Sequence, residues 1–153
     1  DEGGRRWYLR AHEMRRFWAY SFFYKFGLGE LHTIGWFLGH RESEQTWAYI
    51  RESFDGRDKE MRQIKAAYAS SILEGRHSGE SSSKHVESEV RKLILQHFGC
   101  NSIKFIDSDD LRSYLERIIE EGILEIEPKF IRDIDGVDYE ILWVLRQKEA
   151  QNA

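Results

Sequence analysis

The sequence is poor in cysteine and proline and contains no long hydrophobic run. Its single cysteine, Cys100, cannot form an internal disulfide, which excludes a disulfide framework and suits a reducing compartment. No apolar stretch approaches the roughly 20 residues that a membrane-spanning helix needs, and no basic-then-apolar leader opens the chain. These absences predict a soluble cytoplasmic protein that has no membrane partner.

The chain does have enough apolar material to bury a core. Of its 153 residues, 41% are hydrophobic and 14% are aromatic. Its net charge of −4 would argue against a nucleic-acid partner, but this charge is unevenly distributed. Residues 1–76 hold 13 Lys and Arg against 11 Asp and Glu, a balance of +2, whereas residues 77–153 hold 10 against 16, a balance of −6. The acidity therefore belongs to the second half of the chain.

Hydrophobic spacing predicts a mostly helical first half. Apolar residues fall almost all round the wheel over residues 14–26, which predicts a helix buried on most sides. A second helix is expected over residues 30–38, ended by Gly39. Thr46 is a candidate N-cap for a short third helix, and residues 58–74 predict an amphipathic helix that ends at Gly75. We assign residues 1–76 to one segment.

The second half predicts a linker followed by an α+β extension. Residues 77–84 are rich in Ser and Gly and form the candidate linker. In residues 85–153 we expect a helix over 86–98, a short strand over 103–106, a helix over 111–118, and a hairpin. The hairpin strands flank Asp135-Gly136, a tight-turn dipeptide, and Pro128 predicts an edge or bent first strand.

This order of elements is close to that of a winged-helix module, provided that the helix over residues 58–74 supplies the first of its three helices. A winged helix that reads DNA usually has a basic recognition helix, but the helix over 111–118 and its flanks are acidic. Acidic side chains repel phosphate. We therefore expect residues 85–153 to contact protein or to pack against the rest of the chain.

Three short motifs in the first half carry chemistry. His12 and Arg15 are three residues apart, so on a helix they share one face and can meet the same oxyanion. The sequence Leu38-Gly39-His40 follows, and Tyr49 comes nine residues after His40. Arginine matches two phosphate oxygens, and histidine can transfer a proton near neutral pH. Tyrosine has a free pKa of about 10, so it needs such neighbours in order to attack phosphorus. Together the motifs indicate phosphoryl transfer.

The motifs occur in the order found in tyrosine recombinases, the phage-integrase family: His-x-x-Arg, then Leu-Gly-His, then the nucleophilic tyrosine. Residues 9–52 resemble the C-terminal half of the catalytic domain of that family, and the text between the motifs fits as well, LRAHEMRRFWAYSFFYKFGLGELHTIGWFLGHRESEQTWAYI. The resemblance implies a mostly α fold in which the helical half of a recombinase catalytic domain is followed by the α+β extension.

The resemblance also implies a role for each residue. Tyr49 would attack the DNA to form a 3′-phosphotyrosyl intermediate, and Arg15 would hold the scissile phosphate. His12 would act in general acid/base catalysis, and His40 would donate a hydrogen bond to a non-bridging oxygen. Arginine and histidine would supply the charge stabilisation, so no cofactor and no metal is expected. The implied function is site-specific DNA recombination, integration or excision, by a protein of a mobile element.

The family uses two further groups, an upstream arginine and a lysine on a β-hairpin. Only eleven residues precede His12, so we expect this chain to be a fragment that is inactive alone and works within a longer integrase. One alternative is a non-catalytic, integrase-derived DNA-binding or regulatory protein. A second is a winged-helix interaction protein in which the resemblance is only ancestral.

Other expectations concern partners and simpler structural roles. Four further arginines are candidate contacts to double-stranded DNA, and hence to the nucleoid: Arg5, Arg6, Arg10 and Arg16. The segment after Tyr49 is expected to mediate homo-oligomerisation on DNA, and no small-molecule substrate is expected. His97 and Cys100 have no suitable second pair, which argues against zinc. Tyr49 could instead be a core or rim aromatic, and His40 a C-terminal helix cap.

Overall fold

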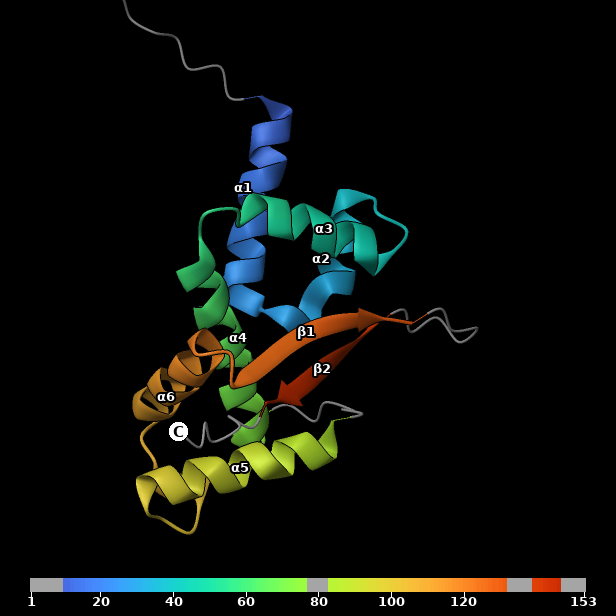
Figure 1. The fold of residues 1–153 in the computed structure, drawn as a ribbon. Helices are drawn as coiled ribbons and strands as arrows, with labels where there is room; N and C mark the ends of the chain where they lie inside the picture. The colour runs from blue at the N-terminus through green and yellow to red at the C-terminus, as the bar shows by residue number, and fades with distance from the viewer. Residues whose placement is uncertain (1–9, 77–82, 132–138, 147–153) are drawn as a thin grey trace, which may run out of the picture.

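The structure is a computed structural model, and it describes residues 10–76, 83–131 and 139–146. Within these ranges the chain forms six α-helices, two short 3₁₀ helices and two strands (Figure 1). In chain order they are α1 (Ala11–Phe26), η1 (Leu28–Glu30), α2 (Leu31–Leu38), α3 (Ser43–Ser53), α4 (Asp58–Leu73), α5 (Lys84–Phe98), η2 (Ile103–Phe105), α6 (Ser108–Glu120), β1 (Leu124–Phe130) and β2 (Tyr139–Leu145). The predicted mostly helical fold with a C-terminal hairpin is confirmed. None of the described helices is long and apolar enough to cross a membrane.

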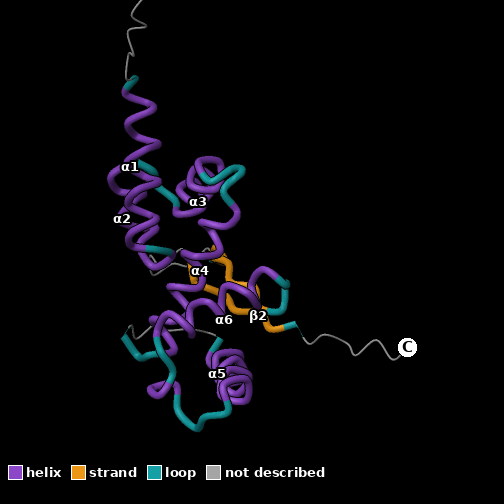
Figure 2. Tube along the Cα trace, turned by 90° about the vertical axis from the view of Figure 1, so that its left-hand side faces the viewer, coloured by secondary structure: helices purple, strands orange, loops and turns teal. Residues whose placement is uncertain are grey.

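Helix α1 differs from the prediction that it is buried on most sides. Only Ala19 and Phe23 of this helix are fully buried, whereas Phe17 is 72% exposed and Met14 is 55% exposed. The physical reason is visible in Figure 1, where the start of α1 extends beyond the other helices. Its first turns contact α2 and α3 on one side, through Arg15 and His12. Figures 1 and 2 both place the start of α1 and α5 at opposite ends of the molecule.

Helices α2 and α3 are joined by a tight connection. Gly39 ends α2 in the left-handed region, with φ of 69°, and the amide of His40 donates to the carbonyl of Gly35 at 2.9 Å. This is the arrangement in which glycine is favoured after a helix. Helix α3 then begins at Ser43, so the prediction that Thr46 caps it is wrong. Thr46 lies inside the helix and is fully buried. Its hydroxyl contacts the ring of His40 and does not cap the helix start.

Helices α4, α5 and α6 with the hairpin have the element order of a winged helix, and α4 packs against α6. The strand predicted over residues 103–106 is wrong, because this segment forms the 3₁₀ helix η2. Ser102 accepts a hydrogen bond from the Lys104 amide at 3.4 Å and caps that turn. The apolar character that suggested a strand belongs to Ile103, which is buried in the core.

Strands β1 and β2 pair antiparallel, with Leu124 opposite Leu145 and Pro128 opposite Ile141. They are the two strands of the sheet in the described chain, so each is an edge strand, as Pro128 predicted. Alternate residues bury one face, with Ile126, Ile141 and Trp143 in the core. The predicted turn at residues 135–136 lies outside the described residues.

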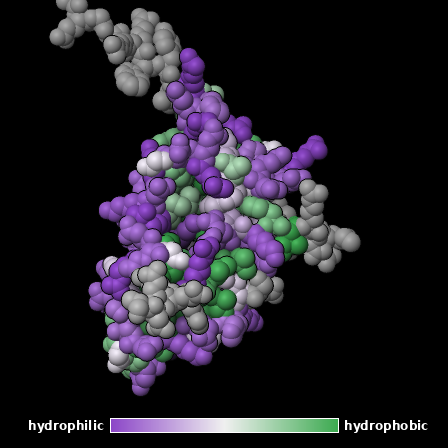
Figure 3. All heavy atoms as spheres, in the orientation of Figure 1, coloured by the Kyte–Doolittle hydropathy of each residue, from purple (hydrophilic) through white to green (hydrophobic). Residues whose placement is uncertain are grey.

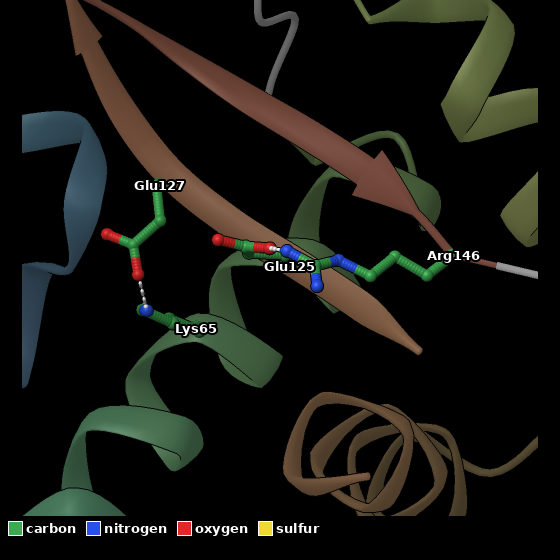
Figure 4. A network of polar contacts seen from close by, with 4 residues as sticks. All are labelled: Lys65, Glu125, Glu127 and Arg146. Carbon is green, nitrogen blue, oxygen red and sulfur yellow. Dashed lines mark hydrogen bonds and ion pairs between the residues drawn. The ribbon is translucent and has the colours of Figure 1, made fainter. Parts of the chain in front are cut away.

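The hairpin is attached to the helices by both apolar and polar contacts. Lys65 on α4 pairs with Glu127 on β1 and so joins a helix to the hairpin (Figure 4). Within the hairpin, Arg146, just after β2, pairs with Glu125 on β1 at 2.7 Å. The amide of Trp143 also donates to the hydroxyl of Ser83 at 3.1 Å.

The two predicted segments share one buried cluster. Ile50 and Ile64 from the first segment and Leu115 from the extension all belong to it. Ser83 and Lys84, the last two residues of the predicted linker, already lie at the start of α5. Hydrophilic residues cover much of the face drawn in Figure 3, with apolar residues showing near its centre. The packing therefore continues across the predicted boundary.

Candidate active site

The projecting end of α1 carries the His-x-x-Arg motif. His12 and Arg15 lie in its first turns and are exposed, and the amide of Arg10, the residue before the helix, donates to the carboxylate of Glu13 at 3.2 Å. This bond satisfies one of the amides that a helix start leaves without a partner. The motif is thus presented on a regular helix at the surface.

Arg15 connects this motif to the second one. Its guanidinium donates a hydrogen bond to the carbonyl of Leu38, the last residue of α2. A cation is favourable there because the carbonyl end of a helix carries partial negative charge. Arginine has five N–H donors, so the bond to Leu38 leaves others for a phosphate oxygen.

His40 lies immediately beyond that helix end and is half-buried. Its Nδ1 is 3.0 Å from Oγ1 of Thr46, and its ring centroid is 5.8 Å from that of Tyr49. Burial, together with the positive charge of Arg15, lowers the pKa of His40 below its usual value of 6.5. This shift favours the neutral imidazole, which has one nitrogen available as a donor.

Tyr49 on α3 lies between the two histidines. The centroids of the His12 and Tyr49 rings are 6.5 Å apart, and these rings meet edge to face. The Tyr49 hydroxyl oxygen is buried and has no hydrogen-bond partner among the described residues. Leaving such a group without a partner costs free energy. Other side-chain atoms of the described chain, among them Ser70 Oγ, are in the same state, so it is the two neighbouring histidines that distinguish Tyr49.

The structure therefore brings all four predicted catalytic residues together from α1, the end of α2 and α3. The ring contacts of Tyr49 and the bond from Arg15 to Leu38 link the three motifs directly. The ring of Tyr49 is partly buried and packs against the core, as a rim aromatic would, and His40 directs its Nδ1 at a side-chain hydroxyl on the next helix.

The candidate DNA contacts have different surroundings. Arg5 and Arg6 lie outside the described residues, and Arg10 is exposed beside the start of α1. Arg16 forms an ion pair with Glu52 of α3 at 3.3 Å, and both side chains are largely exposed. Arg16 thus joins α1 to α3, a structural role that its place in the arginine cluster did not predict.

Two residues of the site escaped sequence reasoning. Thr46 contacts His40, and Gly35 in α2 lies so close to Thr46 that an added Cβ would be 2.7 Å from its Oγ1. A glycine inside an apolar helix is the one available signal, because it often marks a close approach between elements. Nothing in the sequence pointed to the partner.

No cluster in the described part of the chain has the composition of a metal site, since no three His, Cys, Asp or Glu side chains there are grouped to hold an ion. The ring of His97 stacks on that of Tyr114, with centroids 4.3 Å apart. This contact gives His97 a packing role in the extension.

Comparison with known proteins does not identify a family for this chain. No family model, curated protein or solved structure matches the chain. The functional argument therefore rests on the residues and on their geometry.

Proposed function

We propose that the segment of residues 1–76 is the C-terminal part of the catalytic domain of a tyrosine-type site-specific DNA recombinase, which cuts and rejoins DNA through Tyr49. The observation that carries the proposal is the Tyr49 hydroxyl, which is buried without a partner beside His12 and His40. The proposal is also supported by the ring contacts of Tyr49 with His12 and His40, which bring together residues up to 37 positions apart in the sequence.

The proposed cleavage balances its atoms and charges as follows. Tyr49 Oη attacks the scissile phosphorus and loses its proton to His12, and the bond from phosphorus to the 5′ oxygen breaks. The 5′ oxygen takes a proton from the hairpin lysine that the resemblance implies in the longer polypeptide, and leaves as a hydroxyl. Arg15 and the neutral His40 donate hydrogen bonds to the non-bridging oxygens, where negative charge is concentrated. Attack by a new 5′-hydroxyl reverses the step and rejoins the strands.

The remaining surfaces suggest how the protein meets its partners. Arg10 lies next to the His-x-x-Arg turn, so duplex DNA reaching Arg15 would pass over it. The exposed start of α6 carries Asp109 and Asp110, which repel phosphate. In this proposal the winged-helix part therefore contacts protein, including other copies of the chain bound to the same DNA.

A nicked suicide DNA substrate tests the catalytic proposal. The native polypeptide that contains these residues should form a covalent protein–DNA adduct visible by denaturing electrophoresis. Tyr49→Phe should abolish the adduct, because it removes the attacking oxygen, while leaving DNA binding intact. Tyr24→Phe is the matched control, since this exposed tyrosine of α1 contacts Tyr20, and no hydrogen bond or ring contact in the described chain joins it to the motifs.

Two outcomes would overturn the proposal. An adduct that persists in Tyr49→Phe would remove Tyr49 from the chemistry. DNA binding without any adduct from the native polypeptide would instead support the alternative, a non-catalytic DNA-binding or regulatory protein derived from an integrase.

The self-association proposal needs a surface change rather than a truncation. Deleting residues 85–153 would uncover α4, which packs against α6, and the deletion would therefore unfold what it was meant to test. Asp109→Lys with Asp110→Lys reverses the exposed charge at the start of α6 and leaves the core untouched. Weaker assembly on DNA in analytical ultracentrifugation would support the proposal, and an unchanged assembly would contradict it.

A further inference from the structure

We infer that Thr46 is a positioning residue, whose hydroxyl holds His40 in the tautomer that carries its proton on Nε2. The inference concerns this chain's own residues, and its consequence for catalysis rests on the proposed function. Two observations carry it, namely the contact between Thr46 and His40 and the tight approach of Gly35 to Thr46.

The contact lies in a closely packed place. Thr46 is fully buried on α3, and its Oγ1 is 3.0 Å from Nδ1 of His40. Gly35 on α2 is also buried, and a methyl group there would come within 2.7 Å of the same oxygen. Glycine costs about 1 kcal/mol relative to alanine inside a helix. Here that cost is offset, because α2 can approach α3 closely enough for the hydroxyl to reach His40.

The direction of the hydrogen bond follows from the proton of Thr46. Among the described residues, His40 is the side chain that its hydroxyl contacts. If Nδ1 donated, the buried hydroxyl proton would have no acceptor, and a buried donor without a partner costs more than an oxygen with a spare lone pair. The hydroxyl therefore donates to Nδ1, and a neutral imidazole must then carry its proton on Nε2.

This arrangement gives α3 two tasks in the proposed reaction. Thr46 and Tyr49 are three residues apart, so they lie on one face of α3, which is the face that meets His40. One helix then carries the nucleophile and also fixes the histidine beside it. The Nε2–H group is left to donate to a non-bridging phosphate oxygen without any change in the charge of the ring.

The test compares Thr46→Val, which replaces the hydroxyl by a methyl group of similar size, with Thr46→Ser, which retains it. Nitrogen-15 NMR of the histidine rings reports the tautomer directly. We expect His40 to be the Nε2–H form in the wild type and in Thr46→Ser, and a mixture of both forms in Thr46→Val. Circular dichroism and thermal unfolding confirm that each variant is folded.

The suicide-substrate assay measures the consequence for catalysis. Losing one oriented donor should slow adduct formation about tenfold in Thr46→Val, with an unchanged Kd for DNA, whereas Thr46→Ser should stay close to the wild type. An Nδ1–H tautomer in the wild type, or an unchanged tautomer of His40 in Thr46→Val, would overturn the inference.

The two proposals fail in different ways. If the tautomer depends on Thr46 but the native polypeptide forms no adduct, the proposed function fails and the tautomer assignment stands. If the adduct forms through Tyr49 at an equal rate in Thr46→Val, the positioning role fails and the proposed function stands.

Discussion

The first three helices and the extension of residues 85–153 cover their large apolar side chains to different degrees. Helices α1 and α2 expose several of them, among them Trp36 at 77% and Phe17 at 72%. The extension encloses Trp143 at 2% exposure in the core, and its strands alternate between buried and less buried residues, although Phe105 is exposed there. The aromatic-rich part of the sequence is therefore the part that covers its aromatics least. Aromatic content indicates how much apolar surface a segment could bury. Burial also requires that other parts of the chain pack against that surface.

The two tryptophans provide the largest test of this difference. Trp143→Ala should lower the free energy of unfolding by about 3–5 kcal/mol, because it leaves a cavity beneath the hairpin. Trp36→Ala should change it by less than about 0.5 kcal/mol, as surface substitutions usually do. Urea unfolding followed by circular dichroism measures both. Equal losses would contradict the contrast between the two parts.

A second prediction concerns the close approach of Gly35 on α2 to Thr46 on α3. Gly35→Ala should destabilise the protein by about 1–3 kcal/mol, because the new methyl group meets Oγ1 of Thr46. In a Thr46→Ala background that oxygen is gone, so the same change should cost much less. A double-mutant cycle measured by urea unfolding isolates the coupling. Additive effects would show that Gly35 has another role.

A third and smaller effect concerns the pH dependence of stability. His40 has a lowered pKa in the folded chain, so the unfolded chain binds its proton more readily. By linkage, this group makes stability rise with pH through the region at and below its unfolded pKa of about 6.5 and fall as the solution is acidified. Arg15 on α1 and Tyr49 on α3 face the same ring. In unfolding measured from pH 5 to 8, His40→Gln should give a flatter profile, and an unchanged slope would assign the effect elsewhere.

The smallest effects should come from exposed ion pairs, and here the two parts should behave alike. Arg16 with Glu52 and Arg146 with Glu125 are both largely solvent-exposed. Double-mutant cycles with alanine should give a coupling energy below about 1 kcal/mol for each, reduced further by salt. A coupling energy of several kcal/mol in either pair would contradict the expectation that exposed ion pairs contribute little to stability.

The sequence predicted helices best where two independent signals agreed. For α4, the apolar spacing and Gly75 bracketed the helix to within a residue, because burial needs a regular period and termination needs a left-handed residue. The catalytic candidates also came from sequence, since each motif fixes a local spacing. The structure then showed that these motifs meet.

Other features depend on contacts that local sequence does not encode. The burial of α1 depends on what lies against it. The segment 103–105 forms a 3₁₀ helix that Ser102 caps, and in the described residues the sheet contains β1 and β2 alone. Thr46 has the residue type of a helix cap, but its hydroxyl contacts the half-buried imidazole of His40 instead of a backbone amide. In each case a partner distant in sequence decided between two locally acceptable structures.

Pro128 occupies the middle of β1, a strand that has a free edge in the described chain. Its ring nitrogen carries no hydrogen, so an incoming strand from another molecule would find a donor missing at the centre of that edge. Strand addition, the usual first step of β-aggregation, is weakened at this point. The residue that interrupts the sequence pattern thus protects an exposed hairpin from associating with other hairpins.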